Sequence, residues 1–280
     1  MSRNATKDLT TGSPMKLILG FGIPLLFGML FQQFYNMMDT IIVGKFLGVS
    51  ALASVGATGS INFMIIGFCM GVCNGFAIPV AQRFGAKDEH GMRKFVANSV
   101  WLSIIFAVVM AVLVCVFCRQ ILELMNTPED IIDGSYSYIF VIFLGIPATY
   151  MYNLLSGIMR SLGDSKTPLY LLIFSSILNI ILDLLSIIVL KMGVAGAAWA
   201  TVIAQAVSGF CCLGVIWKKF PILHVQREEW QPDKLCILNL CNMGIPMGLQ
   251  YSITAIGSVI IQAAVNSLGS VAVASVAAAV

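Results

Sequence analysis

Two carboxylates stand out because they lie inside long apolar stretches of the chain. Of its 13 acidic residues, only Asp39 and Asp183 do so, and the others occur in polar segments. A charged side chain at the centre of a bilayer costs about 2.5–3.5 kcal/mol on insertion scales, so a carboxylate there usually serves a function. Ion binding and proton transfer are the functions that such carboxylates most often perform.

The spacing to the nearest lysines places three polar residues at one depth. Asp39 comes six residues before Lys45, and Asp183 comes eight before Lys191. Thr201 follows Lys191 by ten residues on the returning helix. At about 1.5 Å per residue, all three lie roughly 9–15 Å below the outer surface.

Two more polar residues belong to this layer. Asn179 precedes Asp183 by four residues, so it shares the same helix face one turn deeper. Tyr138 enters the membrane from outside, slightly above the layer. Such a set can bind a proton or a sodium ion, because burial and a second carboxylate both favour the protonated or cation-bound form. The alternative is that the two aspartates only hydrogen-bond helices together.

The helix of Asp39 carries further candidates. Pro24 removes a backbone hydrogen bond, which favours a kink that could switch with protonation, although a static kink fits equally well. Gln32, Tyr35 and Asn36, together with Asn153 from another span, are candidates for lining a substrate cavity. The alternative for these residues is ordinary hydrogen bonding between helices.

The elements that position these residues are membrane spans. The chain has 280 residues, of which 59% are hydrophobic and 10% are charged. That composition excludes a soluble enzyme, a nucleic-acid-binding domain and a secreted disulfide scaffold. Seven apolar stretches are long enough to cross a bilayer, and they predict an all-α integral membrane protein. They cover residues 17–46, 51–81, 95–117, 135–158, 169–190, 194–217 and 235–268.

Basic residues predict the orientation of these spans. The N-terminal tail and the loops after the second, fourth and sixth spans hold 13 lysines and arginines, including Arg160, and the other side holds three. Basic residues stay in the cytoplasm, so the N-terminus is expected inside. The basic residues of the loop after the sixth span are read as topology signals, and His90 is read as solvated.

An internal repeat is also visible. Residues 22–24 and 244–246 both read GIP, while 47–57 reads LGVSALASVGA and 268–278 reads LGSVAVASVAA. An even number of spans separates the copies, so this is a parallel repeat like that of two-bundle transporters. We expect a cytoplasmic tail (1–16), a six-helix bundle (17–217), a cytoplasmic linker (218–234) and the start of a second, incomplete bundle (235–280). A two-bundle transporter needs about five further spans, so a fragment is expected rather than two associating chains.

Motifs of enzymatic chemistry are not found in the sequence. It contains no phosphate-binding glycine loop that ends in Gly-Lys-Ser/Thr, no nucleophile elbow and no zinc-binding helix motif. We therefore expect no enzyme, no cofactor and no metal beyond a possible sodium ion.

Several motifs resemble the multidrug and toxic compound extrusion (MATE) family. Residues 159–168 read MRSLGDSKTP and 179–183 read NIILD. The first span is similar as well, with Pro24, then QQ at 32–33, YN at 35–36, DT at 39–40 and VG at 43–44. The chain is similar to the DinF-like branch, truncated after the seventh span. No acid follows Pro246, unlike in the NorM-like branch, and this favours a cation site in the N-terminal bundle.

The resemblance implies a twelve-span protein of the MOP superfamily, with a plasma-membrane location in a prokaryote. It implies export of cationic or aromatic small molecules in exchange for H+ or Na+, by a monomer that needs no nucleic acid. It also implies that Asp39, Asn179, Asp183 and Thr201 bind the cation, with Tyr138 as a hydrogen-bonding neighbour and Pro24 as the bend. The 280-residue chain alone is expected to be inactive.

Two other functions remain open. A lipid-linked oligosaccharide flippase shares a related two-bundle architecture, but basic residues are expected in its cavity and none of the spans contains a mid-membrane lysine or arginine. A seven-span receptor matches the number of spans, but it conflicts with the basic N-terminal tail and leaves the repeat unexplained.

Overall fold

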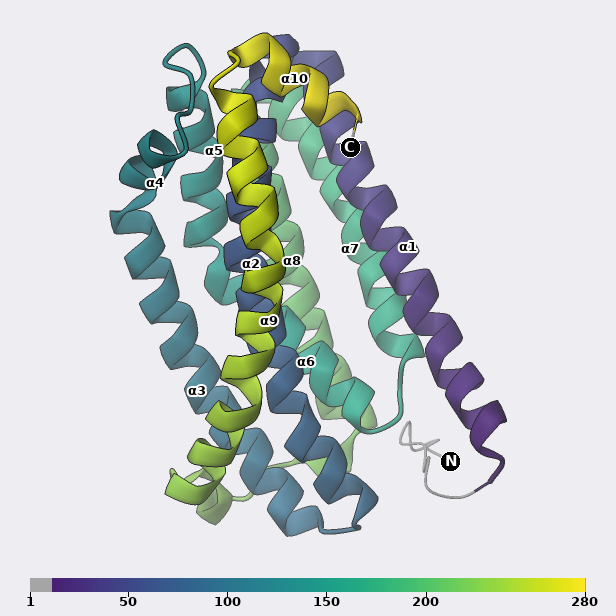
Figure 1. Cartoon of the computed structure of the whole chain (residues 1–280). Helices are drawn as coiled ribbons and strands as arrows, with labels where there is room; N and C mark the ends of the chain where they lie inside the picture. Colours follow the sequence, from purple (N-terminus) through teal and green to yellow (C-terminus); the bar gives the residue numbers. More distant parts are fainter. Residues whose placement is uncertain (1–11, 280) are drawn as a thin grey trace.

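Long apolar helices dominate the computed structural model, which describes residues 12–279 (Figure 1). The helices are α1 (Pro14–Leu47), α2 (Val49–Gly85), α3 (Glu89–Val116), α4 (Cys118–Leu124), α5 (Ile132–Leu144), α6 (Ile146–Ser161), α7 (Lys166–Leu184), α8 (Gly193–Lys219), α9 (Lys234–Asn266) and α10 (Ser270–Ala279). A π-helical turn, η1 (Leu185–Val189), follows α7, and two 3₁₀ turns, η2 (Pro221–Leu223) and η3 (Arg227–Trp230), lie between α8 and α9. The predicted all-α fold class is confirmed.

The expected seven spans are present in a modified form. Six helices of the described residues are long and apolar enough to cross a membrane, and α5 with α6 adds a seventh as a pair bent by 46°. The single span expected at 135–158 is therefore wrong in one respect, because it breaks at Gly145. Pro147, at the start of α6, has no N–H to continue the helix, and a Cβ at Gly145 would overlap Val202 of α8.

The two copies of the repeat share their geometry. Gly48 between α1 and α2 has a φ of 86°, and Gly269 between α9 and α10 has a φ of 94°. Glycine tolerates these values, which other residues rarely adopt. Pro24 and Pro246 occupy the interiors of α1 and α9, and both helices continue past them. The repeat seen in the sequence is thus a structural repeat of a long helix, a glycine turn and a second helix.

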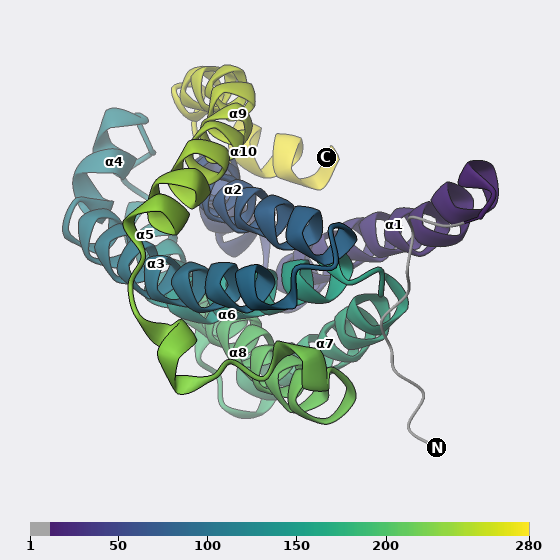
Figure 2. The same cartoon turned by 90° about the horizontal axis from the view of Figure 1, so that it is seen from below.

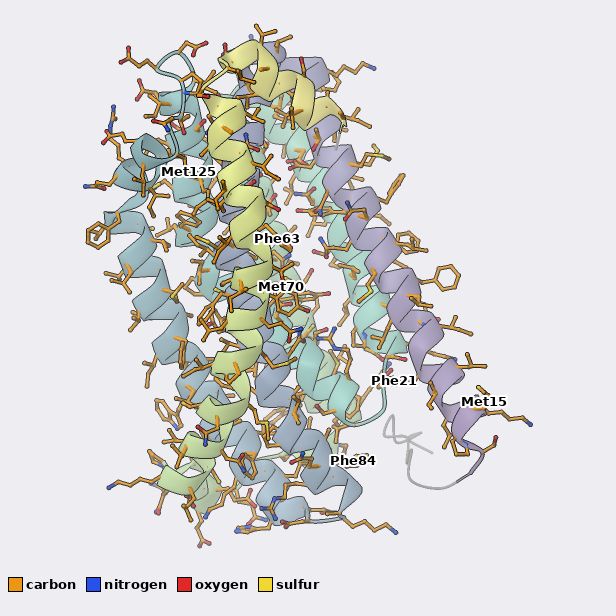
Figure 3. The ribbon with its side chains drawn as sticks, viewed as in Figure 1. Met15, Phe21, Phe63, Met70, Phe84 and Met125 are labelled. Carbon is orange, nitrogen blue, oxygen red and sulfur yellow. The ribbon has the colours of Figure 1, made fainter. Side chains whose placement is uncertain are left out.

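The helix α2 lies at the centre of the fold, between α3, α6 and α9 (Figure 2). Close packing against α9 depends on glycine, since a Cβ at Gly71 would lie 2.6 Å from the carbonyl oxygen of Met247. The helix α1 packs more loosely and buries only Ile42 and Val43. Many of its other apolar side chains are exposed, as Met15 is near the start of the helix (Figure 3). Such a face suits contact with lipid hydrocarbon.

Candidate functional site

Four helices bring the predicted cation-site residues together. Asp39 lies in the C-terminal half of α1, Asn179 and Asp183 lie on α7, Thr201 lies on α8 and Tyr138 lies on α5. Asp183 is completely buried and Asn179 is 1% exposed, so both are removed from solvent. The helices α7 and α8 are antiparallel neighbours, which places residues at one depth side by side as the spacing predicted.

Thr201 is the common partner of this group. Its Oγ1 accepts a hydrogen bond from the Tyr35 hydroxyl at 3.2 Å. In one orientation of its amide, Asn179 Nδ2 also donates to this oxygen, at 3.3 Å. In the other, which satisfies both ends of the amide, Nδ2 donates to Asp183 Oδ2 at 2.9 Å and Oδ1 accepts from the Thr201 N–H at 3.2 Å. Either way, the amide joins α7 to α8.

The carboxyl groups of Asp39 and Asp183 are close neighbours, one on α1 and one on α7. One oxygen of each, Oδ1, is buried and has no hydrogen-bond partner among the described residues. Two dry carboxylates this close repel each other unless a proton or a cation lies between them. The arrangement can therefore hold one positive charge, and its oxygen donors suit either a proton or a hard cation.

Tyr138 lies close to this pair but does not bond to it. Its ring is 6% exposed, and its hydroxyl is near the carboxyl groups of Asp39 and Asp183. No side-chain hydrogen bond of Tyr138 is present among residues 12–279. Its role as a hydrogen-bonding neighbour of the cation site therefore stays a prediction.

The predicted cavity residues divide into three groups. Tyr35 belongs to the site around Thr201. Gln32 and Asn36 bond to each other along α1, with Nε2 of the first 3.5 Å from Oδ1 of the second, and Asn36 is exposed. Asn153 is half-buried on α6 and donates to its own helix at Thr149 O, 2.8 Å away. The structure therefore does not bring the four together.

Three features of the site were not predicted. A π-helical turn begins two residues after Asp183, and Ser186 within it donates to the Asp183 carbonyl oxygen at 3.2 Å; such turns are frequent at functional sites. Gln205, one turn from Thr201 on α8, has a buried Oε1 without a partner among residues 12–279. The third is the bond of Tyr35, named above only as a cavity candidate, to Thr201; its place beside the site could have been found, because Tyr35 lies four residues before Asp39 on the same helix face.

Arg160 was expected in a polar loop and lies elsewhere. It is half-buried in the last turn of α6, and its Nη2 donates to Asn74 Oδ1 of α2 at 3.1 Å. Because α6 ends inside the bundle rather than beyond it (Figure 1), the side chain points toward a neighbouring helix. Arg160 thus belongs to the end of a helix and not to the loop that follows it.

The fold and the site together define a multi-span helical membrane protein with a buried carboxylate pair lined by oxygen donors. The MatE family profile matches residues 24–185, which is more than half of the chain. The chain belongs to the MATE family, as the sequence motifs predicted.

Known relatives agree with this assignment. The chain is 32% identical over 265 residues to "Probable multidrug resistance protein YoeA" of Bacillus subtilis (strain 168), covering 91% of this chain and 57% of that protein. It is 30% identical over 264 residues to "Probable multidrug resistance protein YpnP" of the same strain, covering 94% and 58%. The chain thus spans a little over half the length of these curated relatives.

A solved structure shares the fold. It is described as the inward-facing conformation of a multidrug resistance MATE family transporter of the MOP superfamily, and it superposes with a TM-score of 0.80 at 25% identity. The match covers 92% of this chain and 60% of that one. The helical arrangement described above is therefore that of MATE transporters.

Proposed function

We propose that the protein is a secondary-active multidrug efflux antiporter, which exports cationic or aromatic small molecules in exchange for H+ or Na+. The observation that carries the proposal is the buried pair of Asp39 and Asp183, with unpartnered oxygens and an amide and a hydroxyl beside it. Multidrug resistance is also named for the relatives and for the structural neighbour.

Asp39 and Asp183 bind the coupling cation in this proposal. Asn179 and Thr201 complete its shell, since they already contact Asp183 or each other. Tyr138 lies close enough to join when the cation enters. A site in this N-terminal bundle corresponds to the mechanism of the DinF-like branch.

The helix α1 couples the site to the shape of the bundle. Tyr35 bonds to Thr201 across the α1–α8 contact, and Pro24 lies eleven residues away, about three turns along the same helix. Cation binding at Asp39 changes the forces on one end of a helix that is weakened at Pro24. We propose that this proline is the hinge, and that Gln32, Tyr35, Asn36 and Asn153 contact substrate as the helix moves.

The proposed location is the plasma membrane of a prokaryote, with the N-terminus in the cytoplasm. Thirteen basic residues on the inner side and three on the outer side support this orientation. The proposed partners are the transported small molecule and the lipid bilayer, with a monomer as the working unit and no enzymatic step.

The test uses the protein expressed from its complete gene in everted membrane vesicles. Efflux of a fluorescent organic cation is followed under separate proton and sodium gradients, for wild type and for Asp183→Asn. We expect gradient-driven transport in wild type and its loss in the variant, because the amide cannot carry the negative charge that binds the cation.

The matched control is Asp133→Asn, which makes the same change at a side chain that is 84% exposed in the first turn of α5. It should transport like wild type. Transport that survives in Asp183→Asn would move the coupling site elsewhere, and the gradient that drives wild type identifies the ion.

A further inference from the structure

The segment between α8 and α9 lies along one face of α3. A connecting segment is expected to make few contacts with the helices, because such segments usually run over the surface and are mobile. On α3, the residues that contact the segment are His90, Arg93, Lys94, Asn98 and Trp101. The other four follow His90 by three, four, eight and eleven residues, a spacing that places all five on one face of the helix.

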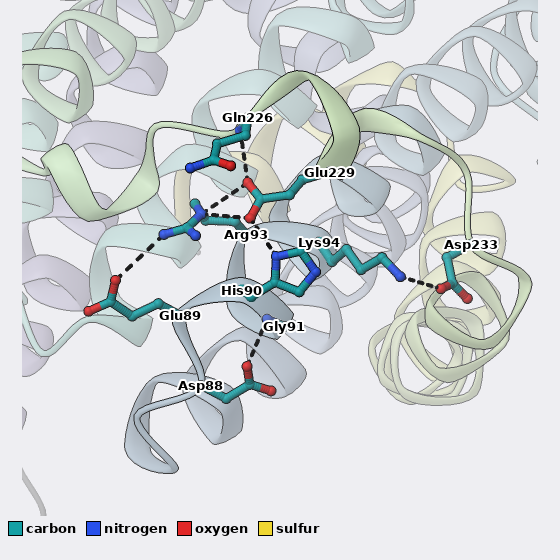
Figure 4. Close-up of polar contacts among 9 residues, drawn as sticks. All are labelled: Asp88, Glu89, His90, Gly91, Arg93, Lys94, Gln226, Glu229 and Asp233. Carbon is teal, nitrogen blue, oxygen red and sulfur yellow. Dashed lines mark hydrogen bonds and ion pairs between the residues drawn. The ribbon is translucent and has the colours of Figure 1, made fainter.

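Glu229 of η3 is the centre of these contacts (Figure 4). It is 1% exposed, and both of its oxygens accept from Arg93 Nε at 2.9 Å. His90 Nδ1 lies 2.9 Å from Oε1, and the Gln226 N–H donates to Oε2 at 2.8 Å. A buried carboxylate with this many donors is held firmly, since charge-assisted hydrogen bonds are the strongest of their kind.

Asp233 joins the same helix face to the start of α9. Its carboxylate accepts from Lys94 Nζ at 2.9 Å, and its N–H donates to Asn98 Oδ1 at 3.0 Å. The carboxylate also caps α9 by accepting from the Leu235 N–H at 2.8 Å and from the Cys236 N–H at 3.3 Å. The residue that starts α9 is therefore bonded to α3 by both its side chain and its backbone.

Two tryptophans close the contact. The rings of Trp101 and Trp230 meet edge to face at 6.4 Å, and Trp101 Nε1 donates to the Trp230 carbonyl oxygen at 3.2 Å. Aromatic pairs in this geometry add stability beyond the area that they bury. We call the whole set, His90, Arg93, Lys94, Asn98, Trp101, Gln226, Glu229, Trp230 and Asp233, the linker clamp.

A second contact fixes α9 above the clamp. A Cβ at Gly75 of α2 would lie 2.5 Å from Gly244 Cα, and one at Gly71 would lie 2.7 Å from Gly248 Cα. Backbones this close interdigitate and have little room to slide. Farther along, Ser252 Oγ donates to Met64 O at 3.2 Å, so the contact of α9 with α2 continues for several turns.

We infer that the linker clamp makes α9 move as one rigid body with α2 and α3 during transport. The linker then keeps α9 fixed against α3 and does not act as a hinge. The inference rests on the proposed transport function. The sequence repeat assigned α9 to the start of a second bundle, so α9 would have been expected to move with that bundle instead. Any movement between the two halves must then occur at other contacts.

The first test locks the clamp. Lys94→Cys and Asp233→Cys are combined in the protein expressed from its complete gene and bridged by a short, reducible bis-methanethiosulfonate reagent. Efflux is measured in vesicles before bridging, after bridging and after reduction. Wild type treated with the reagent and each single variant control for the chain's own eight cysteines.

Bridging is expected to leave the efflux rate unchanged, or to restore it if the unbridged variant is slow. The inference is overturned if bridging abolishes efflux and reduction restores it, or if bridging fails to rescue a slow variant. Absence of efflux in untreated wild type would contradict the proposed function instead, which keeps the two failures apart.

A second test needs no transport. Spin labels are placed at Gln82→Cys on α2 and Glu228→Cys in the linker, both exposed and outside the clamp. Their distance distribution should be the same with and without the coupling cation. A distribution that shifts or splits when the cation is added would show that the linker moves relative to α2, contrary to the inference.

Discussion

At the scale of single residues, carboxylates with buried oxygens occur in two different environments in this chain. Asp39 and Asp183 share a site in which residues 12–279 supply no basic partner, whereas Glu229 is surrounded by Arg93, His90 and the Gln226 N–H. A carboxylate of the first kind is ready to take up a positive charge, and one of the second kind is already satisfied. The first setting suits transport, and the second suits a fixed contact.

Glu229 leads to a prediction about pH. Burial raises the pKa of its carboxyl group, but the hydrogen bonds from Gln226, Arg93 and His90 outweigh burial and leave the pKa below its ordinary value of 4.5. Glu89 also faces this group through Arg93. A depressed pKa means that the clamp stabilises the fold fully above pH 4.5 and loses this contribution as pH falls below it.

We therefore expect Glu229→Gln to lower the melting temperature above pH 4.5, with a difference from wild type that shrinks as pH falls through the depressed pKa. Thermal unfolding in detergent over a pH series measures this. The neighbouring Glu228→Gln is the control, since Glu228 is exposed and should show no such difference. A difference for Glu229→Gln that stays constant down to strongly acidic pH would contradict the prediction.

At the scale of the elements, close approach and interruption shape the bundle. The break at Gly145 turns one expected span into α5 and α6, and the π-helical turn after α7 ends that helix next to Asp183. The contact between α2 and α9 depends on glycines at facing positions. Helix association in membranes relies on such small residues, because lipid supplies no hydrophobic drive between helices.

The glycine contact predicts the effect of a single methyl group. Gly75→Ala should destabilise the fold by about 1–3 kcal/mol, because the new Cβ meets the backbone of α9 and the helices must separate. Gly59→Ala in the same helix is the matched control, since nothing lies within 4 Å of a Cβ there. The test is to measure the melting temperatures of both variants in detergent. Equal values would show that α9 does not pack this closely against α2.

At the scale of the whole molecule, charge and apolar surface divide the fold into zones. The segment from α4 to the first turn of α5 is acidic, with Glu123, Glu129, Asp130 and Asp133, and the opposite end of the bundle, where the linker lies, carries most of the basic residues. Between these ends, α1 exposes a continuous apolar face. This arrangement supports the proposed orientation, in which the basic end lies in the cytoplasm.

Labelling from one side of the membrane tests the proposed orientation. Glu228→Cys in the linker should react with a membrane-impermeant maleimide in everted vesicles only, and Glu129→Cys should react in intact cells only. Both positions are exposed, and wild type reports any reaction of the chain's own cysteines. The reverse pattern would place the N-terminus outside and remove the basis of the depth estimate.

The spans, the repeat and the layer of Asp39, Asp183 and Thr201 could be predicted from the sequence, because each depends on local properties. Apolar length sets where a helix crosses lipid, and helical rise sets the depth of a polar residue along it. The bond of Tyr35 to Thr201 was missed in spite of its favourable spacing from Asp39, since spacing gives a face of one helix and not the partner on another.

Other features followed only from the packing of residues far apart in the chain. Nothing near Glu229 in the sequence indicates that Arg93, 136 residues earlier, pairs with it. The linker, read as a basic loop, is bonded to α3 through Glu229 and Asp233. Arg160 was placed in a loop, but α6 ends within the bundle and gives it Asn74 as a partner. The amino-acid order therefore determined which residues form apolar helices and at which level of a helix a polar residue lies, while the tertiary structure decided which of them meet. The physical reason is that hydrophobicity and helical rise act along a chain, whereas hydrogen bonds and close packing depend on distances across it.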